Sequence, residues 1–357
     1  MPRNQLRGFF MSQSQPISTA LIGFGLSARV FHLPFIQCQA GFSLTAVSTS
    51  QQNEASSIVP DVKLFRDAQS LIQQSDSELV VITAPNQFHY PLAKQALMMG
   101  KHVILEKPLV LTVAEGEELI LLARQSGKIL APFHNRRWDG DFLTLQQLIS
   151  EDVLGQIKGF ESHFDRFRPQ PRQRWREQAG PGSGILYDLG PHLIDQALAL
   201  FGWPQAISAT LKNSRDSAET CDYFHLQLHY ADKEVLLHAD AFSAGPKLRF
   251  KLQGDRGTYL KYGMDPQEER LRAGKTPDRS EWAAEDENHY GTLYQESGEQ
   301  VIATQTGGYQ YFYQEVANAI RYHAPLTVSA DNALDSIRLI ELAQRSHQAG
   351  QRLTLTS

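Results

Sequence analysis

Short apolar runs alternate with segments of helical period along the first third of the chain. Residues 17–22 form a β-branched and apolar run, and residues 78–83 are almost wholly apolar. Strands of this kind are buried on both faces, as in parallel sheets that helices cover on both sides. The pattern predicts a doubly wound parallel sheet. Its other expected strands are residues 43–48, 62–65, 101–105 and 129–133, and its expected helices end near residues 39, 74, 99 and 127.

One of these helices carries a clear start signal. Thr112 is followed three residues later by Glu115. This spacing predicts a capping box, in which each side chain accepts a hydrogen bond from the other residue's backbone NH. The helix that starts there is expected to run to Gly127.

The pattern changes after residue 134. Apolar and polar positions now alternate, which is typical of antiparallel strands with one covered face. The expected strands are residues 159–166, 223–230, 234–239, 248–252 and 258–261. Helices are expected over residues 142–150, 311–322 and 331–349, and a long surface excursion over residues 266–300.

Two domains are expected in a chain of 357 residues, because single hydrophobic cores stop growing near about 250–300 residues. We predict an α/β fold with a doubly wound parallel sheet, followed by an α+β fold with a large, mainly antiparallel open sheet. The boundaries predicted are a flexible extension over residues 1–15, a first domain over 16–134 and a second over 135–357.

Composition narrows the class of protein. With 41% apolar and 20% charged residues and a net charge of −5, the chain resembles a soluble globular protein. It has no long basic stripe for a nucleic acid and no run of the ~20 apolar residues that span a bilayer. Cys38 and Cys221 form no CxxC pair, so neither a thiolate metal site nor a disulfide framework is expected. We expect a cytoplasmic protein without a metal.

A glycine-rich loop joins the first strand to the first helix. It contains Gly23, Phe24, Gly25, Leu26, Ser27 and Ala28. In this context the first glycine permits a tight turn, the second lets backbone NH groups approach a pyrophosphate, and a small third residue lets helix and strand pack closely. The loop predicts a Rossmann domain that binds NAD or NADP, although an ordinary glycine turn is the alternative.

The end of the second strand bears on the choice between the two cofactors. NAD-specific sites place an acid there, on the ribose hydroxyls. This chain has Ser48, Thr49 and Ser50 instead, with no acid before Glu54. The absence of a repelling carboxylate favours NADP, although no arginine adjoins these residues in the sequence.

Two segments carry candidate acid–base groups. Lys107 directly follows the strand at residues 101–105, and Asp188 and His192 stand four residues apart in a predicted helix. Oxidation of an alcohol needs a base near neutral pH, and histidine suits this role with a carboxylate beside it. Alternatively, Lys107 is a solvated edge charge, Asp188 a helix cap and His192 a packed residue.

With these motifs the chain resembles the Gfo/Idh/MocA oxidoreductases over its whole length from Ile17. The matching segments are the GFGLSA loop, TAPNQFH at 83–89, EKP at 106–108 and YDLGPHLIDQ at 187–196. Within the family it is most similar to the NADP-dependent scyllo-inositol dehydrogenase branch and its uncharacterised bacterial relatives. Those relatives also show segments that match residues 134–144, 164–170, 174–178 and 262–271.

The resemblance implies a set of site residues. The family's catalytic lysine, aspartate and histidine fall on Lys107, Asp188 and His192, and which of Lys107 and His192 is the main base stays open. Pro85, Asn86 and His89 are implied against the nicotinamide ribose, and Glu106 near the nicotinamide end. Alternatively, Asn86 is an N-cap and His89 a helix-surface residue. For a polyol or sugar, donor-rich and aromatic residues near the catalytic edge are preferred as substrate ligands. These are Asn135, Arg166, Trp175 and Tyr309.

The resulting hypothesis is reversible oxidation of a secondary hydroxyl on a cyclitol or sugar, with NADP as the hydride carrier. In it, His192 takes the proton with help from Asp188, and Lys107 polarises the oxygen. Two alternatives stay open: a reductase of another carbonyl, imine or C=C substrate, and a non-catalytic NADP(H)-sensing regulator. We also expect a homodimer or homotetramer formed through the exposed sheet face.

Overall fold

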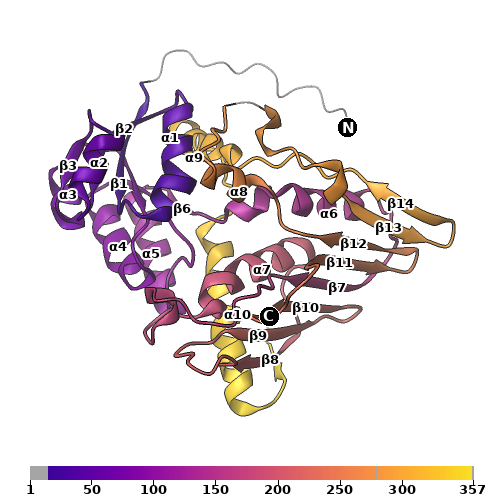
Figure 1. Ribbon diagram of the computed structural model, residues 1–357. Helices are drawn as coiled ribbons and strands as arrows, with labels where there is room; N and C mark the ends of the chain where they lie inside the picture. The colour runs from indigo at the N-terminus through magenta and orange to yellow at the C-terminus, as the bar shows by residue number, and fades with distance from the viewer. Residues whose placement is uncertain (1–14, 279, 356–357) are drawn as a thin grey trace.

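The computed structural model describes residues 15–278 and 280–355. Its two large sheets, of six and nine strands, lie side by side in the molecule (Figure 1). Residues 1–14 of the expected N-terminal extension lie outside the described residues. Among the described residues, no helix combines the length and the apolar composition needed to cross a bilayer.

The first sheet is parallel throughout, in the order β3-β2-β1-β4-β5-β6. This order confirms the doubly wound sheet expected from the sequence. Its strands are β1 (Ile17–Ile22), β2 (Phe42–Ser48), β3 (Lys63–Phe65), β4 (Leu79–Ile82), β5 (His102–Leu105) and β6 (Leu130–Pro132). Its helices are α1 (Leu33–Cys38), which follows a π-helical turn at Ala28–His32, α2 (Gln52–Ile58), α3 (Ala68–Gln74), α4 (His89–Met98) and α5 (Val113–Ser126).

Both faces of this sheet are buried. Along β1, Ala20 and Ile22 belong to one apolar cluster with residues of α3, α4 and α5, whereas Ile17 and Leu21 belong to a second cluster on the other face. That second cluster includes α1 and also α9 (Gln310–Tyr322). The chain therefore returns from its C-terminal part to cover the first sheet. The predicted capping box at the start of α5 is confirmed.

The second sheet is mixed and mainly antiparallel, in the order β14-β13-β12-β11-β7-β10-β9-β8-β15, which confirms the second part of the predicted fold. β10 pairs in parallel with β7, and the other pairs are antiparallel. Helices α7 and α10 pack on one face of it. The strands are β7 (Ile157–His163), β8 (Ala206–Lys212), β9 (Tyr223–His229), β10 (Glu234–Ala239), β11 (Leu248–Gly254), β12 (Gly257–Tyr262), β13 (Gly291–Gln295), β14 (Gly298–Ile302) and β15 (Leu353–Thr354). The remaining helices are α6 (Gly140–Ser150), α7 (Ile185–Phe201), α8 (Gln267–Arg272) and α10 (Ala330–Ala349).

One edge of this sheet differs from the prediction. The surface excursion expected over residues 266–300 contains α8, β13 and the start of β14, so that expectation is wrong in part. Four of the five residues of β14 are exposed, and the strand has no apolar face to bury. Its sequence therefore lacks the alternation by which a half-buried strand is recognised. β8 also lies outside the expected strands.

A buried ion pair connects the end of the first sheet to α7. Arg137 follows β6 and donates from Nε and Nη2 to the two carboxylate oxygens of Asp195 in α7, at 2.5 and 3.0 Å. The side chains of Arg137 and Asp195 are only 11% and 3% exposed. His134 Nδ1 lies 3.6 Å from the same carboxylate. This cluster holds the segment that follows β6 against the helix that carries Asp188 and His192.

We predict that Arg137→Ala destabilises the protein strongly. It would leave the buried carboxylate of Asp195 without its bidentate partner, a loss that costs about 3–5 kcal/mol in proteins. Thermal unfolding should show a lowered midpoint. Arg124→Ala breaks the exposed pair between Arg124 and Asp331 and should leave the midpoint nearly unchanged, because exposed pairs contribute little. Equal midpoints for the two variants would contradict the stabilising role assigned to the pair of Arg137 and Asp195.

Candidate active site

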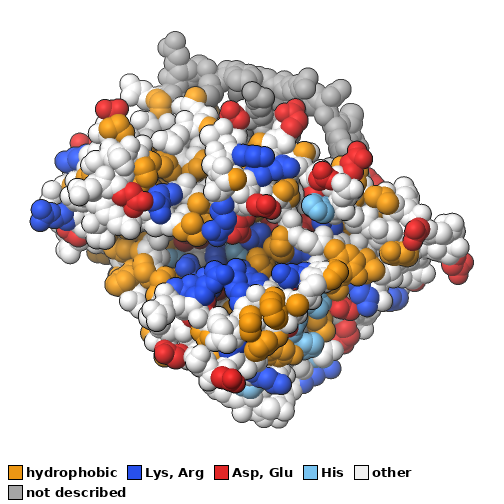
Figure 2. Space-filling view, in the orientation of Figure 1, with side chains coloured by type: hydrophobic (Ala, Val, Ile, Leu, Met, Phe, Trp, Pro, Cys, Tyr) orange, Lys and Arg blue, Asp and Glu red, His pale blue; other side chains and the backbone are white. Residues whose placement is uncertain are grey.

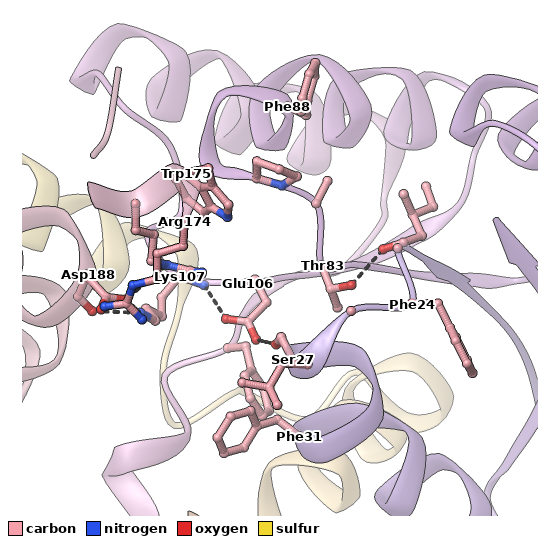
Figure 3. A pocket seen from close by; sticks show the side chains of 18 of the residues that line it. Phe24, Ser27, Phe31, Thr83, Phe88, Glu106, Lys107, Arg174, Trp175 and Asp188 are labelled. Carbon is pink, nitrogen blue, oxygen red and sulfur yellow. Dashed lines mark hydrogen bonds and ion pairs between the residues drawn. The ribbon is translucent and has the colours of Figure 1, made fainter. Parts of the chain in front are cut away.

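A cavity of about 1150 Å³ opens where the carboxyl ends of the first sheet meet α7 and the second sheet. Figure 3 looks into this cavity, and Figure 2 shows Lys and Arg side chains gathered around the hollow in the middle of this face. Its walls come from the loops that follow β1 to β6 and from the segment between β7 and α7. Open parallel sheets bind their ligands at this edge.

The predicted phosphate loop lines the cavity through Gly23, Phe24, Gly25, Leu26 and Ser27. Gly23 has a φ of +88°, and a Cβ there would lie 2.7 Å from Oγ1 of Thr83, so the turn requires glycine. A Cβ at Gly25 would meet no atom within 4 Å. This open space against the backbone fits the close approach of a phosphate group. Ala28 is buried in the apolar cluster behind the loop.

Arg66, which was not identified from the sequence, lies near the end of β2. Thr49 and Ser50 line the cavity, whereas Ser48 is buried and its carbonyl oxygen accepts a hydrogen bond from Gly23 N at 3.0 Å. Arg66 lines the cavity beside them. It stands there because β3 pairs with β2, with Phe65 opposite Ser48. The pairing of β3 with β2 is the signal by which Arg66 could have been found.

The loop after β4 contributes fewer cavity residues than the resemblance implies. Pro85 lines the cavity, but Asn86 and His89 do not. Asn86 Nδ2 donates to the carbonyl of Gly182 at 2.9 Å. The two ring nitrogens of His89 lie 2.7 and 2.9 Å from the carbonyl oxygens of Pro108 and Ala84. Both side chains therefore fix the loops around the cavity.

Glu106 is a buried, charged group at the base of the cavity. Its carboxylate accepts a hydrogen bond from the Ser27 hydroxyl and lies 3.1 Å from Nε2 of His32. Burial opposes its ionisation, yet His32 and Lys107 outweigh burial and lower the pKa of Glu106 to about 2. Nδ1 of His32 lies 2.7 Å from the hydroxyl of Tyr313 in α9. His32 and Tyr313 were not identified from the sequence.

Lys107 and Asp188 meet across the cavity from opposite domains (Figure 3). Lys107 Nζ donates to the Asp188 carbonyl oxygen at 2.7 Å and to Oδ1 at 3.1 Å. The carboxylate also lies 3.2 Å from Nε of Arg176 and 3.9 Å from Nη1 of Arg166. Burial would raise the pKa of Asp188, but the charges of Lys107, Arg176 and Arg166 lower it well below its usual range. Asp188 is therefore a carboxylate at neutral pH.

The expected partnership of Asp188 with His192 is not present. The carboxylate is directed to Lys107 and the two arginines, and among the described residues Nδ1 of His192 is buried without a hydrogen-bond partner. Burial, followed by the charge of Lys107, lowers the pKa of His192 well below its usual range. The imidazole is therefore neutral. The helical spacing of four residues predicted a shared face correctly but did not identify which group Asp188 contacts.

Three of the four predicted substrate ligands line the cavity: Asn135, Arg166 and Trp175. Tyr309 does not, and this expectation is corrected. Its side chain is fully buried and donates to Oδ1 of Asp139 at 2.6 Å. Its hydroxyl is therefore occupied by a structural partner between α6 and α9.

The lining also contains polar residues outside the four preferred ligands. These are Arg136, Arg168, Arg172, Arg174, Arg176, Glu268 and Arg272. Arg136 and Arg272 both pair with Glu268, which stands in α8. Arg136 and Glu268 are 132 residues apart, so the sequence gives no local signal for that contact, whereas Arg272 and Glu268 are four residues apart in α8.

Comparison with known proteins agrees with this architecture. Residues 17–134 match the "Oxidoreductase family, NAD-binding Rossmann fold" and residues 146–355 match the "Oxidoreductase family, C-terminal alpha/beta domain". The chain belongs to the Gfo/Idh/MocA oxidoreductase family. Two family relatives match along nearly their full length. The uncharacterised oxidoreductase YdgJ of Escherichia coli is 42% identical, over 96% of this chain and 99% of its own.

The second is scyllo-inositol 2-dehydrogenase (NADP(+)) IolW of Bacillus subtilis. It is 37% identical, over 95% of this chain and 96% of its own. Among solved structures, yvaA of Bacillus subtilis superimposes with a TM-score of 0.92 at 35% identity, covering 97% of this chain and 100% of that one. The family and the two-part fold expected from the sequence are confirmed.

We predict a pH-dependent stability effect of Asp188→Asn. The substitution leaves Lys107, Arg166 and Arg176 close together without their shared anion, so the melting temperature at pH 7 should fall by several degrees. Because folding lowers the pKa of Asp188, its stabilisation is complete above the ordinary value of 3.8 and is lost only as the pH falls below it. The difference from wild type should be constant above about pH 5 and narrow below about pH 4.

Asp216→Asn is the matched control, because this carboxyl group is exposed. It should show little difference from wild type at any pH. A melting-temperature difference for Asp188→Asn that widens on acidification would contradict the charge state assigned to Asp188.

Proposed function

We propose that this protein is an NADP-preferring dehydrogenase that oxidises a secondary hydroxyl of a cyclitol or sugar to a ketone, and catalyses the reverse reduction. One observation carries the proposal. Lys107 and the neutral imidazole of His192 line the same cavity as the phosphate loop. The name of the relative IolW, an NADP⁺-dependent scyllo-inositol 2-dehydrogenase, supports the cofactor and the class of substrate.

The cavity fits a nicotinamide dinucleotide laid along the edge of the first sheet. The backbone from Gly23 to Ser27 would hold the pyrophosphate, where Gly25 leaves open space. Thr49 and Ser50 would face the adenosine ribose, and Arg66 its 2′-phosphate. Glu106 would lie toward the nicotinamide end. Bound there, NADP⁺ supplies the acceptor of the hydride.

The proton transfer is assigned to the groups opposite that edge. His192 lines the cavity, and its neutral imidazole is the form that accepts a proton. Lys107, held by Asp188, would donate a hydrogen bond to the same oxygen and stabilise its developing negative charge. The hydroxyl thus loses a proton to His192 and its carbon loses a hydride, which leaves a ketone.

The catalytic assignment predicts that Lys107→Met and His192→Asn each lower kcat by about 10²–10⁴-fold, the usual contribution of acid–base groups. Affinity for NADPH, measured by fluorescence titration, should stay within a few fold of wild type. Turnover is measured by the absorbance of NADPH with a panel of polyols and sugars that includes scyllo- and myo-inositol. Lys158→Met, on the exposed start of β7, is the control and should keep full turnover. Wild-type turnover in both active-site variants would exclude this mechanism.

The cofactor assignment predicts that Arg66→Ala raises KM for NADP by about 10–100-fold, the loss expected for a charged hydrogen bond to phosphate. KM for NAD should change little, because NAD lacks the 2′-phosphate. Lys63→Ala removes an exposed charge on the same strand and should affect neither cofactor. An equal change of KM for NADP and NAD in Arg66→Ala would place Arg66 elsewhere in the site.

A further inference from the structure

The segment between β7 and α7 gives one wall of the cavity a strong positive charge. Five arginines of this segment line the cavity, and Figure 2 shows the basic side chains gathered at the rim of the hollow. They are Arg166, Arg168, Arg172, Arg174 and Arg176. A neutral polyol needs hydrogen-bond donors, but it does not need a concentration of charge on this scale.

Three of the five arginines have carboxylate partners. Arg166 and Arg176 face Asp188, and Arg174 Nε donates to Glu177 at 2.7 Å. Arg168 and Arg172 differ. Among the described residues, neither guanidinium group has an ion pair or a hydrogen bond to a protein acceptor. They can therefore pair with an incoming anion without giving up an ion pair that is present in the structure.

The positive charges of Arg168, Arg172 and Arg174 lie close enough to repel one another. Burial, followed by the charges of Arg172 and Arg174, lowers the pKa of Arg168, while Glu177 and then Asp188 are near enough to raise it in part. Arg168 thus lies within electrostatic reach of the other arginines and of the carboxylate that holds Lys107. Like charges repel, and a bound anion relieves the repulsion.

The backbone that carries them is fixed by buried contacts. The carboxylate of Glu177 accepts from Arg172 N at 2.8 Å and from Arg215 Nη1 at 3.0 Å. Arg215 also donates to Asp222 at 2.8 Å, and these three charged side chains are 7% exposed or less. These buried contacts fix the backbone of the segment, which places Arg168 and Arg172 in the cavity wall.

The anionic groups of the proposed cofactor have other partners. The loop from Gly23 to Ser27 is available to the pyrophosphate, and Arg66 lines an adjoining recess with residues 49–54 for the 2′-phosphate. We propose that Arg168 and Arg172 form a subsite for an anionic group of the substrate, a carboxylate or a phosphate, so that the substrate is an acidic or phosphorylated sugar or cyclitol. This inference rests on the proposed dehydrogenase function.

The first test measures binding without turnover. Inorganic phosphate is titrated by calorimetry into enzyme that holds saturating NADP⁺, so that the cofactor's own phosphate positions are filled. The double variant Arg168→Gln/Arg172→Gln should bind phosphate at least about tenfold more weakly than wild type, since charged hydrogen bonds are lost. Arg345→Gln, an exposed arginine in α10 outside the cavity, is the control and should bind as wild type does. Equal binding by the double variant, or no binding by wild type, overturns the proposal.

The second test compares substrates in matched pairs. Each neutral compound is assayed beside its acidic derivative, for example glucose beside glucuronate and glucose 6-phosphate. Wild-type kcat/KM should be about tenfold or more higher for an acidic member, and the double variant should lose this advantage while KM for NADP stays unchanged.

The outcomes separate the two levels of the proposal. Oxidation of neutral compounds with no acidic preference, and no effect of the double variant, leaves the dehydrogenase and overturns the anion subsite. A rise in KM for NADP alone assigns the two arginines to the cofactor and also overturns it. If no compound is oxidised, the dehydrogenase fails, and the phosphate titration alone decides whether the anion subsite exists.

Discussion

The ion pair between Lys107 and Asp188 is the contact on which the site depends. It joins the end of β5 in the first sheet to the first turn of α7, and both side chains are mostly buried, at 13% and 16% exposed. A buried charge is tolerated only with a partner, so each group requires the other domain to be in place. This ion pair, together with the apolar packing, therefore sets how the two sides of the cavity face each other.

Helix α7 extends this constraint along one face. Asp188, His192 and Asp195 follow one another at intervals of four and three residues, so they share a side of the helix. Asp188 meets Lys107 and Asp195 meets Arg137, and both cations follow strands of the first sheet. His192 lies between the two ion pairs. The two ion pairs hold this face of the helix toward the first sheet, and the imidazole lies at the cavity wall.

The sequence predicts features that depend on local pattern and fails where contacts are distant. The strands β4 and β5 can be recognised from a few consecutive apolar residues, and the phosphate loop from the spacing of its glycines. The hairpin of β13 and β14 gives no such signal because four of the five residues of β14 are exposed. Arg66 becomes part of the site only through the pairing of β3 with β2. Tyr309 was expected to contact the substrate because it is aromatic and polar, but its hydroxyl donates a hydrogen bond to Asp139 in the interior.

The distribution of charge also limits how the proposed reaction proceeds. Asp188 is shared by Lys107, Arg166 and Arg176, and among the described residues His192 has no carboxylate partner, so the positive charge of Lys107 disfavours a second cation beside it. The same charge stabilises the substrate oxygen as it becomes negative. Lys107 therefore has two opposing effects on the proton transfer: it disfavours the imidazolium, and it favours loss of the hydroxyl proton that the imidazole accepts.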